Sequence, residues 1–119
     1  MRKNSKIGRF HHNIFYEIPI RLIYEEKYRG LSDSAKISYS VLKNRLVVDG
    51  HYDEHMNMYV KYLPENLNKL FYKSQKETQE IIKELVEYQL IEIEYEENCI
   101  RIYLADLSIS SNDWEEWLL

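Results

Sequence analysis

Four polar side chains recur at helical spacing on one side of a predicted helix, and their chemistry suits contact with nucleic acid. The set is Gln75, Lys76, Gln79 and Lys83. A glutamine amide can pair with two edge atoms of adenine in a major groove, and a lysine can donate to guanine or to a phosphate. An ordinary solvated face is the alternative, because Glu80, Glu84 and Glu87 lie on the same helix and can pair with these lysines.

Further cations and one aromatic residue surround this helix in the sequence. Lys69, Tyr72 and Lys73 precede it at a predicted turn, where phosphate contacts are expected. The first nine residues form a basic arm without apolar periodicity, and either they track a groove of a duplex or they are an ordinary solubilising tail. The cations of the arm are Arg2, Lys3, Lys6 and Arg9.

Other site chemistries find little support in the sequence. His51 and His55 flank Asp53, but they fall in a predicted loop with no cysteine or further histidine nearby, so we expect no metal site. There is no Ser–His–Asp order and no pair of catalytic carboxylates. Three glycines in the whole chain are too few for a phosphate-binding loop. We therefore expect neither an enzyme nor a cofactor.

Two helices that must position these side chains are predicted between Leu63 and Tyr88. Pro64 suits the first turn of a helix that runs to about Tyr72. Ser74 and Glu77 have the spacing of a capping box, which begins a second helix that runs to about Tyr88. The second helix has one apolar stripe with spacings of three and four residues. Its members are Thr78, Ile81, Ile82 and Leu85.

A β-hairpin is predicted directly after the second helix, where apolar and acidic residues alternate. A turn at Glu97-Asn98 keeps the apolar face continuous across both strands and places Arg101 opposite Glu94. The expected pairs are Tyr95–Ile100, Ile93–Ile102 and Ile91–Leu104. Two helices joined by a tight turn and followed by a hairpin predict an α+β winged helix-turn-helix: a three-helix core, a short strand and a C-terminal hairpin, the wing.

Upstream, the pattern predicts three further segments. Phe10–Ile23 is β-like and is interrupted by Pro19. Ser32 is the expected N-cap of a helix with an apolar stripe through Tyr39 and Leu42. Asp49–Asn57 is then expected to be a loop, and Met58–Leu63 a short strand. We divide the chain into a basic arm (1–12), a winged-helix domain (13–107), and a polar linker with a Trp-containing turn (108–119).

Composition and charge agree with one folded DNA-contacting domain. The chain has 119 residues, is 45% hydrophobic and has a single cysteine, so it cannot form an intramolecular disulfide. Residues 1–45 hold 10 Lys and Arg against 4 Asp and Glu, whereas residues 46–119 hold 6 against 16. Such asymmetry is typical of nucleic-acid contact from the basic side or of ordinary surface variation. Without a membrane-length apolar run or a signal-peptide core, we expect a cytoplasmic protein.

Several short runs of residues match a known family in the same order along the chain. They are Phe15-Tyr16-Glu17-Ile18-Pro19, Tyr28-Arg29-Gly30-Leu31-Ser32, Ala35-Lys36, Tyr39-Ser40-Val41-Leu42 with Arg45, Tyr52-Asp53-Glu54, Met58-Tyr59-Val60, Lys83-Glu84-Leu85 and Leu90-Ile91. By these runs, residues 13–105 resemble the N-terminal domain of plasmid replication-initiator proteins of Gram-positive bacteria, the RepA N-terminal-domain type. The resemblance implies a winged helix that binds double-stranded DNA at a plasmid origin and associates as a homodimer. Proteins of that type usually carry a further C-terminal domain and a longer, basic wing loop, whereas the loop here is Glu96-Glu97-Asn98.

We therefore expect a double-stranded DNA-binding protein in the replication or transcription control of a plasmid or other mobile element. The acidic wing argues either for a wing turned away from the duplex or for a surface that meets protein. Trp114, Trp117 and Leu118 share one face of the last turn, which either packs on its own chain or anchors another protein or subunit. The alternative function is accordingly a winged-helix adaptor that binds a replication or regulatory protein through its wing and its Trp tail.

Overall fold

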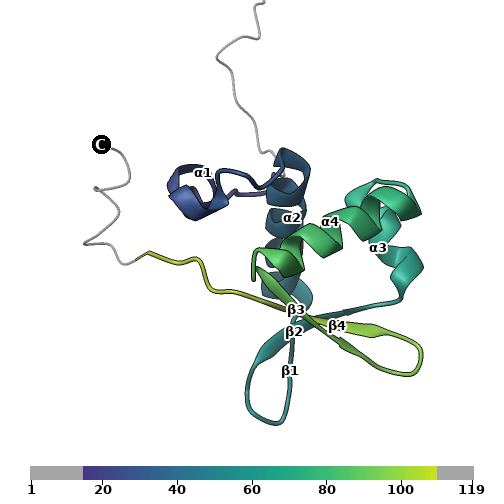
Figure 1. The fold of residues 1–119 in the computed structure, drawn as a ribbon. Helices are drawn as coiled ribbons and strands as arrows, with labels where there is room; N and C mark the ends of the chain where they lie inside the picture. Colours follow the sequence, from purple (N-terminus) through teal and green to yellow (C-terminus); the bar gives the residue numbers. More distant parts are fainter. Residues whose placement is uncertain (1–14, 110–119) are drawn as a thin grey trace, which may run out of the picture.

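The computed structural model describes residues 15–109. Helices and strands follow in the order α1 (Ile20–Tyr24), a 3-10 turn η1 (Glu26–Tyr28), α2 (Asp33–Asp49), β1 (His51–Tyr52), β2 (Met58–Tyr62), α3 (Pro64–Phe71), α4 (Gln75–Glu87), β3 (Ile91–Tyr95) and β4 (Ile100–Leu104). The four strands form one antiparallel sheet in the order β1-β2-β4-β3. The core helices lie on one side of the sheet. The tips of the two hairpins, β1–β2 and β3–β4, point away from the helices and in different directions (Figure 1). The predicted winged helix-turn-helix is confirmed.

The wing adopts the predicted register. The pairs Tyr95–Ile100, Ile93–Ile102 and Ile91–Leu104 are all present, and Arg101 lies opposite Glu94. The N–H of Glu96 donates to the carbonyl of Cys99 at 2.9 Å, which closes the turn. The apolar face is buried at Ile91 and Ile102. Its exposure increases along β3 toward the tip, where the Tyr95 side chain is 80% exposed. The wing therefore extends beyond the core that supports its base.

The core helices also begin where capping residues predicted. The Ser32 hydroxyl accepts from the N–H of Ala35 at 3.1 Å and starts α2. Tyr39 and Leu42 of α2 are buried against Leu85 of α4 and Ile102 of β4 in a single hydrophobic core. Pro64 occupies the first turn of α3, where its missing N–H costs no helical hydrogen bond.

Two upstream predictions are wrong. Ile20–Tyr24 is helical rather than part of a β-like segment: the N–H of Leu22 donates to the carbonyl of Pro19 at 3.0 Å, and Leu22 is fully buried. No described strand pairs with this region, because it follows Pro19 into a helical turn that buries Leu22 in the core. The expected loop Asp49–Asn57 contains β1, because His51 and Tyr52 pair with β2. A strand of two residues is too short to show alternation.

Candidate nucleic-acid interface

Helix α4 presents the predicted polar face to solvent. Its buried side consists of Thr78, Ile81 and Leu85, with Ile82 half-buried beside them. The polar face lies beside this stripe, and each of its four side chains is exposed. They are Gln75, Lys76, Gln79 and Lys83. The packing therefore leaves these amides and ammonium groups available to a partner while it fixes the helix below them.

The N-terminus of α4 is capped as predicted, with one difference. The Ser74 hydroxyl accepts from the N–H of Glu77 at 3.1 Å. The Glu77 carboxylate does not reach back to the Ser74 N–H, as a full capping box requires, but accepts from the Ser74 hydroxyl at 3.0 Å. The cap still holds the first turn of α4 rigid, because the serine oxygen satisfies a free N–H there.

The turn between α3 and α4 has an unusual backbone at Tyr72. Its φ is 55°, in the left-handed region where glycine is the ordinary residue. The N–H of Lys73 donates to the carbonyl of Asn68 at 3.0 Å, and that of Tyr72 to Lys69 at 3.2 Å, which is the pattern of a Schellman motif. The Tyr72 side chain is 93% exposed, so a bulky aromatic group is held outward at a place that disfavours it.

The predicted phosphate-contacting residues meet at this turn. Lys69, Tyr72 and Lys73 line an open concavity of about 410 Å³ together with Ser74 at the start of α4. Within the described part of the chain, no ion pair involves Lys69, Lys73, Lys76 or Lys83. The neutralising pairs considered for Lys76 and Lys83 with Glu80 are thus not formed.

One glutamate of α4 has a structural partner instead. The Glu84 carboxylate accepts from the N–H of Ser32 at 2.6 Å and from its hydroxyl at 2.7 Å. It therefore ties α4 to the N-cap of α2, which its position off the apolar stripe did not reveal. The contact takes one of the four acidic groups of α4 into a hydrogen-bonded cap.

In the wing, the cations are engaged by a single carboxylate. Glu96 pairs with Arg101 and lies 3.5 Å from the ammonium of Lys61 on β2. The hydrogen bond from Arg101 is the main reason that the pKa of Glu96 is lowered. The guanidinium of Arg101 also stacks 4.5 Å from the centre of the Tyr59 ring. Sequence reasoning identified only Arg101 as a counter-charge, because it did not predict the β2–β4 pairing that brings Lys61 to the wing.

A groove of about 490 Å³ separates α4 from the wing. Gln75, Gln79 and Lys83 line its α4 side, and Ile93 and Tyr95 line its wing side. The helix face and the wing therefore border one continuous concave surface. Asn68 lines both this groove and the concavity at the turn, and no sequence pattern singles it out.

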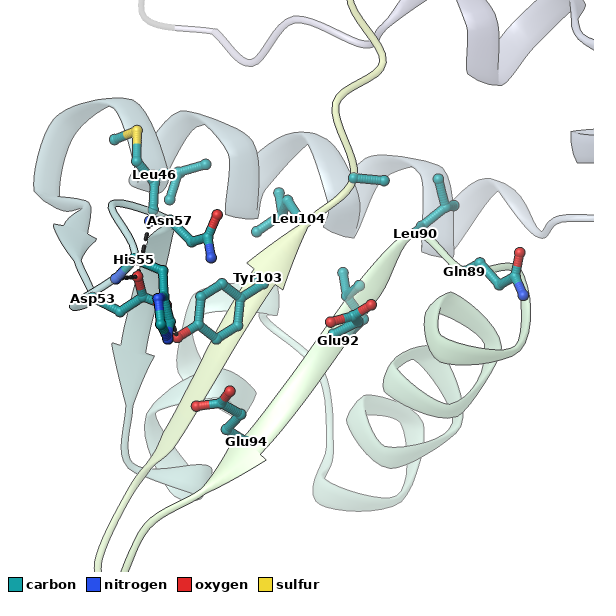
Figure 2. Close-up of a pocket in the computed structure, with 13 residues that line it drawn as sticks. Leu46, Asp53, His55, Asn57, Gln89, Leu90, Glu92, Glu94, Tyr103 and Leu104 are labelled. Carbon is teal, nitrogen blue, oxygen red and sulfur yellow. Dashed lines mark hydrogen bonds between the residues drawn. The ribbon is translucent and has the colours of Figure 1, made fainter.

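The residues weighed as a metal site have other roles. Figure 2 shows Asp53 and His55 beside Tyr103 in a concavity of about 470 Å³ that Glu92 and Glu94 also line. Asp53 accepts from the N–H groups of His55 and Asn57 and from the Tyr103 hydroxyl, at 2.8 to 3.0 Å. Its carboxylate thus holds the β1–β2 loop. No group of three metal-ligating side chains occurs in residues 15–109.

The remaining predicted site residues lie outside the described part of the chain. They are Arg2, Lys3, Lys6 and Arg9 of the arm and Trp114, Trp117 and Leu118 of the tail. Of the helices between residues 15 and 109, none is long and apolar enough to cross a membrane.

Three solved structures share this fold. One, described as the N-terminal domain of a DNA-binding protein, superposes with a TM-score of 0.72 at 24% identity and covers 87% of this chain and 82% of its own. A Rep–DNA complex gives 0.72 at 24% identity, with coverage of 87% and 83%. An MDR initiator gives 0.71 at 28% identity, with coverage of 87% and 85%.

No curated protein matches the chain significantly. The family model for the N-terminus of replication initiator protein A, RepA, matches residues 14–116, which is most of the sequence. The resemblance noted from short runs of residues therefore extends over the whole described domain. The chain belongs to the family of RepA replication-initiator N-terminal domains.

Proposed function

We propose that this replication-initiator domain binds double-stranded DNA through α4 and the α3–α4 turn. The observation that supports it most is the contrast within the described residues between the exposed lysines of this surface, which form no ion pair, and the two cations at the wing, Lys61 and Arg101, which are paired with Glu96. A solved neighbour of the same fold is a complex of Rep with DNA, which agrees with the proposal. No catalytic role is assigned to the domain.

In this proposal α4 enters the major groove with its N-terminal half foremost, as recognition helices do. The four side chains of its polar face contact base edges or the adjoining phosphates. Lys69, Tyr72 and Lys73 contact the backbone and set the position of the helix, because phosphate contacts orient a protein on a duplex without reading its sequence. The basic arm adds further phosphate contacts.

The biological setting follows from the family. We propose that binding occurs at the origin or promoter of a plasmid or other mobile element, where it controls replication or transcription. We further propose a homodimer that occupies paired half-sites, since symmetric sites mirror a two-fold protein. Sedimentation of the protein with and without duplex measures this directly, and a monomer on every duplex would contradict it.

Salt dependence tests the DNA proposal at low cost. Each phosphate neutralised by Lys or Arg releases counterions, so the logarithm of the affinity should fall linearly with the logarithm of salt concentration. Titration of fluorescent duplexes, including the element's own origin and promoter, measures the slope. Absence of binding at low salt to every duplex would reject the proposal.

The arm has its own test. Deletion of residues 1–9 should weaken binding to all duplexes by a similar factor and flatten the salt slope, because its four cations face phosphates. A truncated protein with the slope of the full chain would show that the arm takes no part.

An adaptor function is the second candidate. The concavity lined by Asp53, Glu92 and Glu94 is acidic, which suits a basic protein segment and repels DNA. If the domain is an adaptor, the duplex titrations should show no DNA binding, whereas a replication or regulatory protein should still bind to the domain. Glu92→Lys and Glu94→Lys should then abolish the protein contact and leave α4 irrelevant to it.

A further inference from the structure

Helix α2 has an exposed side that the proposed DNA contact does not use. Phe15 and Val47 are 68% and 76% exposed, and they border a groove of about 270 Å³ along this side. Lys43 and Glu17 also line it. The volume is below the ~300–1,000 Å³ of ordinary small-molecule sites, so the groove fits a side chain from a polypeptide better than a metabolite.

The chain after β4 passes next to this groove. The Tyr39 hydroxyl donates to the carbonyl of Ala105 at 2.5 Å, and Leu107 is buried in the core. Figure 2 shows the segment after Leu104 rising across α2. Tyr39, which holds Ala105, precedes Lys43 by about one turn of α2, so the tail begins on the side of α2 that also carries Lys43.

Two segments outside the described residues could reach the groove, and their charges differ. Residues 110–119 contain three acidic residues, no basic residue and both tryptophans of the chain. Residues 1–14 contain four Lys and Arg and no acidic residue. Lys43 attracts the first segment and Glu17 attracts the second, so the charges of the groove do not choose between them. The family match does favour the first segment, because it begins only at residue 14. The family match continues to residue 116, so Trp114 falls within the domain that the family shares.

We propose that the groove formed by Phe15, Lys43 and Val47 is the docking site of the chain's own C-terminal segment, residues 110–119. An indole of Trp114 or Trp117 fills the apolar part, and the neighbouring carboxylates face Lys43. The short connection from Leu107 gives the tail a high effective concentration at its own groove, which favours this contact over one with a second copy. The docked tail covers the exposed apolar side chains of Phe15 and Val47.

Tryptophan fluorescence tests the proposal in the full chain, because the only two tryptophans lie in the tail. The emission of the folded protein should be blue-shifted from that of the unfolded chain at any protein concentration. Val47→Glu puts a like charge into the groove and should shift the emission to the red. Val48→Glu is the matched control: Val48 is also exposed, at 62%, but lies outside the groove, so its emission should remain that of the wild type.

Several results would overturn the proposal. They are the emission of a water-exposed indole in the wild type, equal shifts in the two valine variants, and a blue shift that grows with protein concentration, which would assign the tail to a second copy. Circular dichroism should show both variants folded, since both valines are exposed. Lys43→Glu provides an independent measurement: it should also shift the emission to the red, and an unchanged emission would contradict the charge argument.

Discussion

The helix-turn-helix surface and the wing differ in what their charged side chains contact. Around α4, Lys69, Lys73, Lys76 and Lys83 have no ionic partner among the described residues, while Tyr72 is held outward by the backbone. In the wing, Glu96 engages both Arg101 and Lys61 of the neighbouring β2. A cation already paired with a carboxylate has less to gain from a phosphate. We therefore expect the helix and the turn, rather than the wing, to supply most of the free energy of the proposed DNA binding.

The largest effect is expected on α4 itself. Lys76→Ala or Gln79→Ala should lower sequence-specific affinity by about 1–3 kcal/mol, because each removes a contact to a base or its phosphate. Titration of a labelled specific duplex measures the loss. Lys27→Ala, which changes an exposed lysine paired with Glu25, should have no effect. Unchanged affinity in both α4 variants, with the fold intact, would refute the assignment.

Substitution of Tyr72 should change the stability of the domain and its affinity for DNA in opposite directions. Tyr72→Gly removes the strain of a left-handed residue and should raise the free energy of unfolding by about 1 kcal/mol, yet weaken DNA binding. Denaturant unfolding and duplex titration measure the two quantities. Gln89→Gly is the matched control, because Gln89 also has a positive φ, of 58°, at the far end of α4. It should gain stability without loss of affinity; equal affinities in the two variants would remove Tyr72 from the interface.

A smaller effect is expected in the wing. Glu96→Gln releases Lys61 and Arg101 and should tighten DNA binding by less than about 1 kcal/mol, with a steeper salt slope. Glu92→Gln removes the same charge from a residue that has no ion pair in the described chain, and it should do less. Equal gains would mean that only net charge matters. No gain in either would place the wing away from the duplex.

The smallest effect on binding is expected at the β1–β2 loop, outside both regions. Hydrogen bonds, chiefly from the N–H of Asn57, lower the pKa of Asp53 below its ordinary value. The stability it contributes is therefore present above about pH 4 and is lost as the pH falls below that value. Asp53→Asn should melt at a lower temperature at pH 7, with the difference from wild type shrinking toward pH 3 and affinity unchanged. Glu54→Gln, an exposed neighbour, should melt like the wild type.

The sequence predicted those elements whose signals are local. The Ser74 cap and the stripe from Thr78 to Leu85 place α4, and strict alternation places β3 against β4. Each depends on residues only a few positions apart. That is also why the polar face of α4 could be identified before the structure.

The contacts and elements that the sequence did not reveal depend on residues that are far apart along the chain. Lys61 reaches Glu96 only because β2 pairs with β4, and Glu84 reaches Ser32 only because α4 packs on α2. Helix α1 resembled a strand because its apolar residues are branched, and the burial of Leu22 in the core, which favours the helical turn, depends on residues distant in the sequence. Strand β1 has only two residues. It pairs with β2 because the loop between the two strands is held in a tight turn by Asp53.

The link between Glu84 and Ser32 joins positions 52 residues apart and has a measurable consequence. Both hydrogen bonds exist only while α2 and α4 are in contact, so they break whenever α4 separates from α2. The Ser32 amide is then protected from hydrogen exchange only while α4 is docked. Its exchange rate would report, from a different helix, how often the DNA-facing element opens in the native protein.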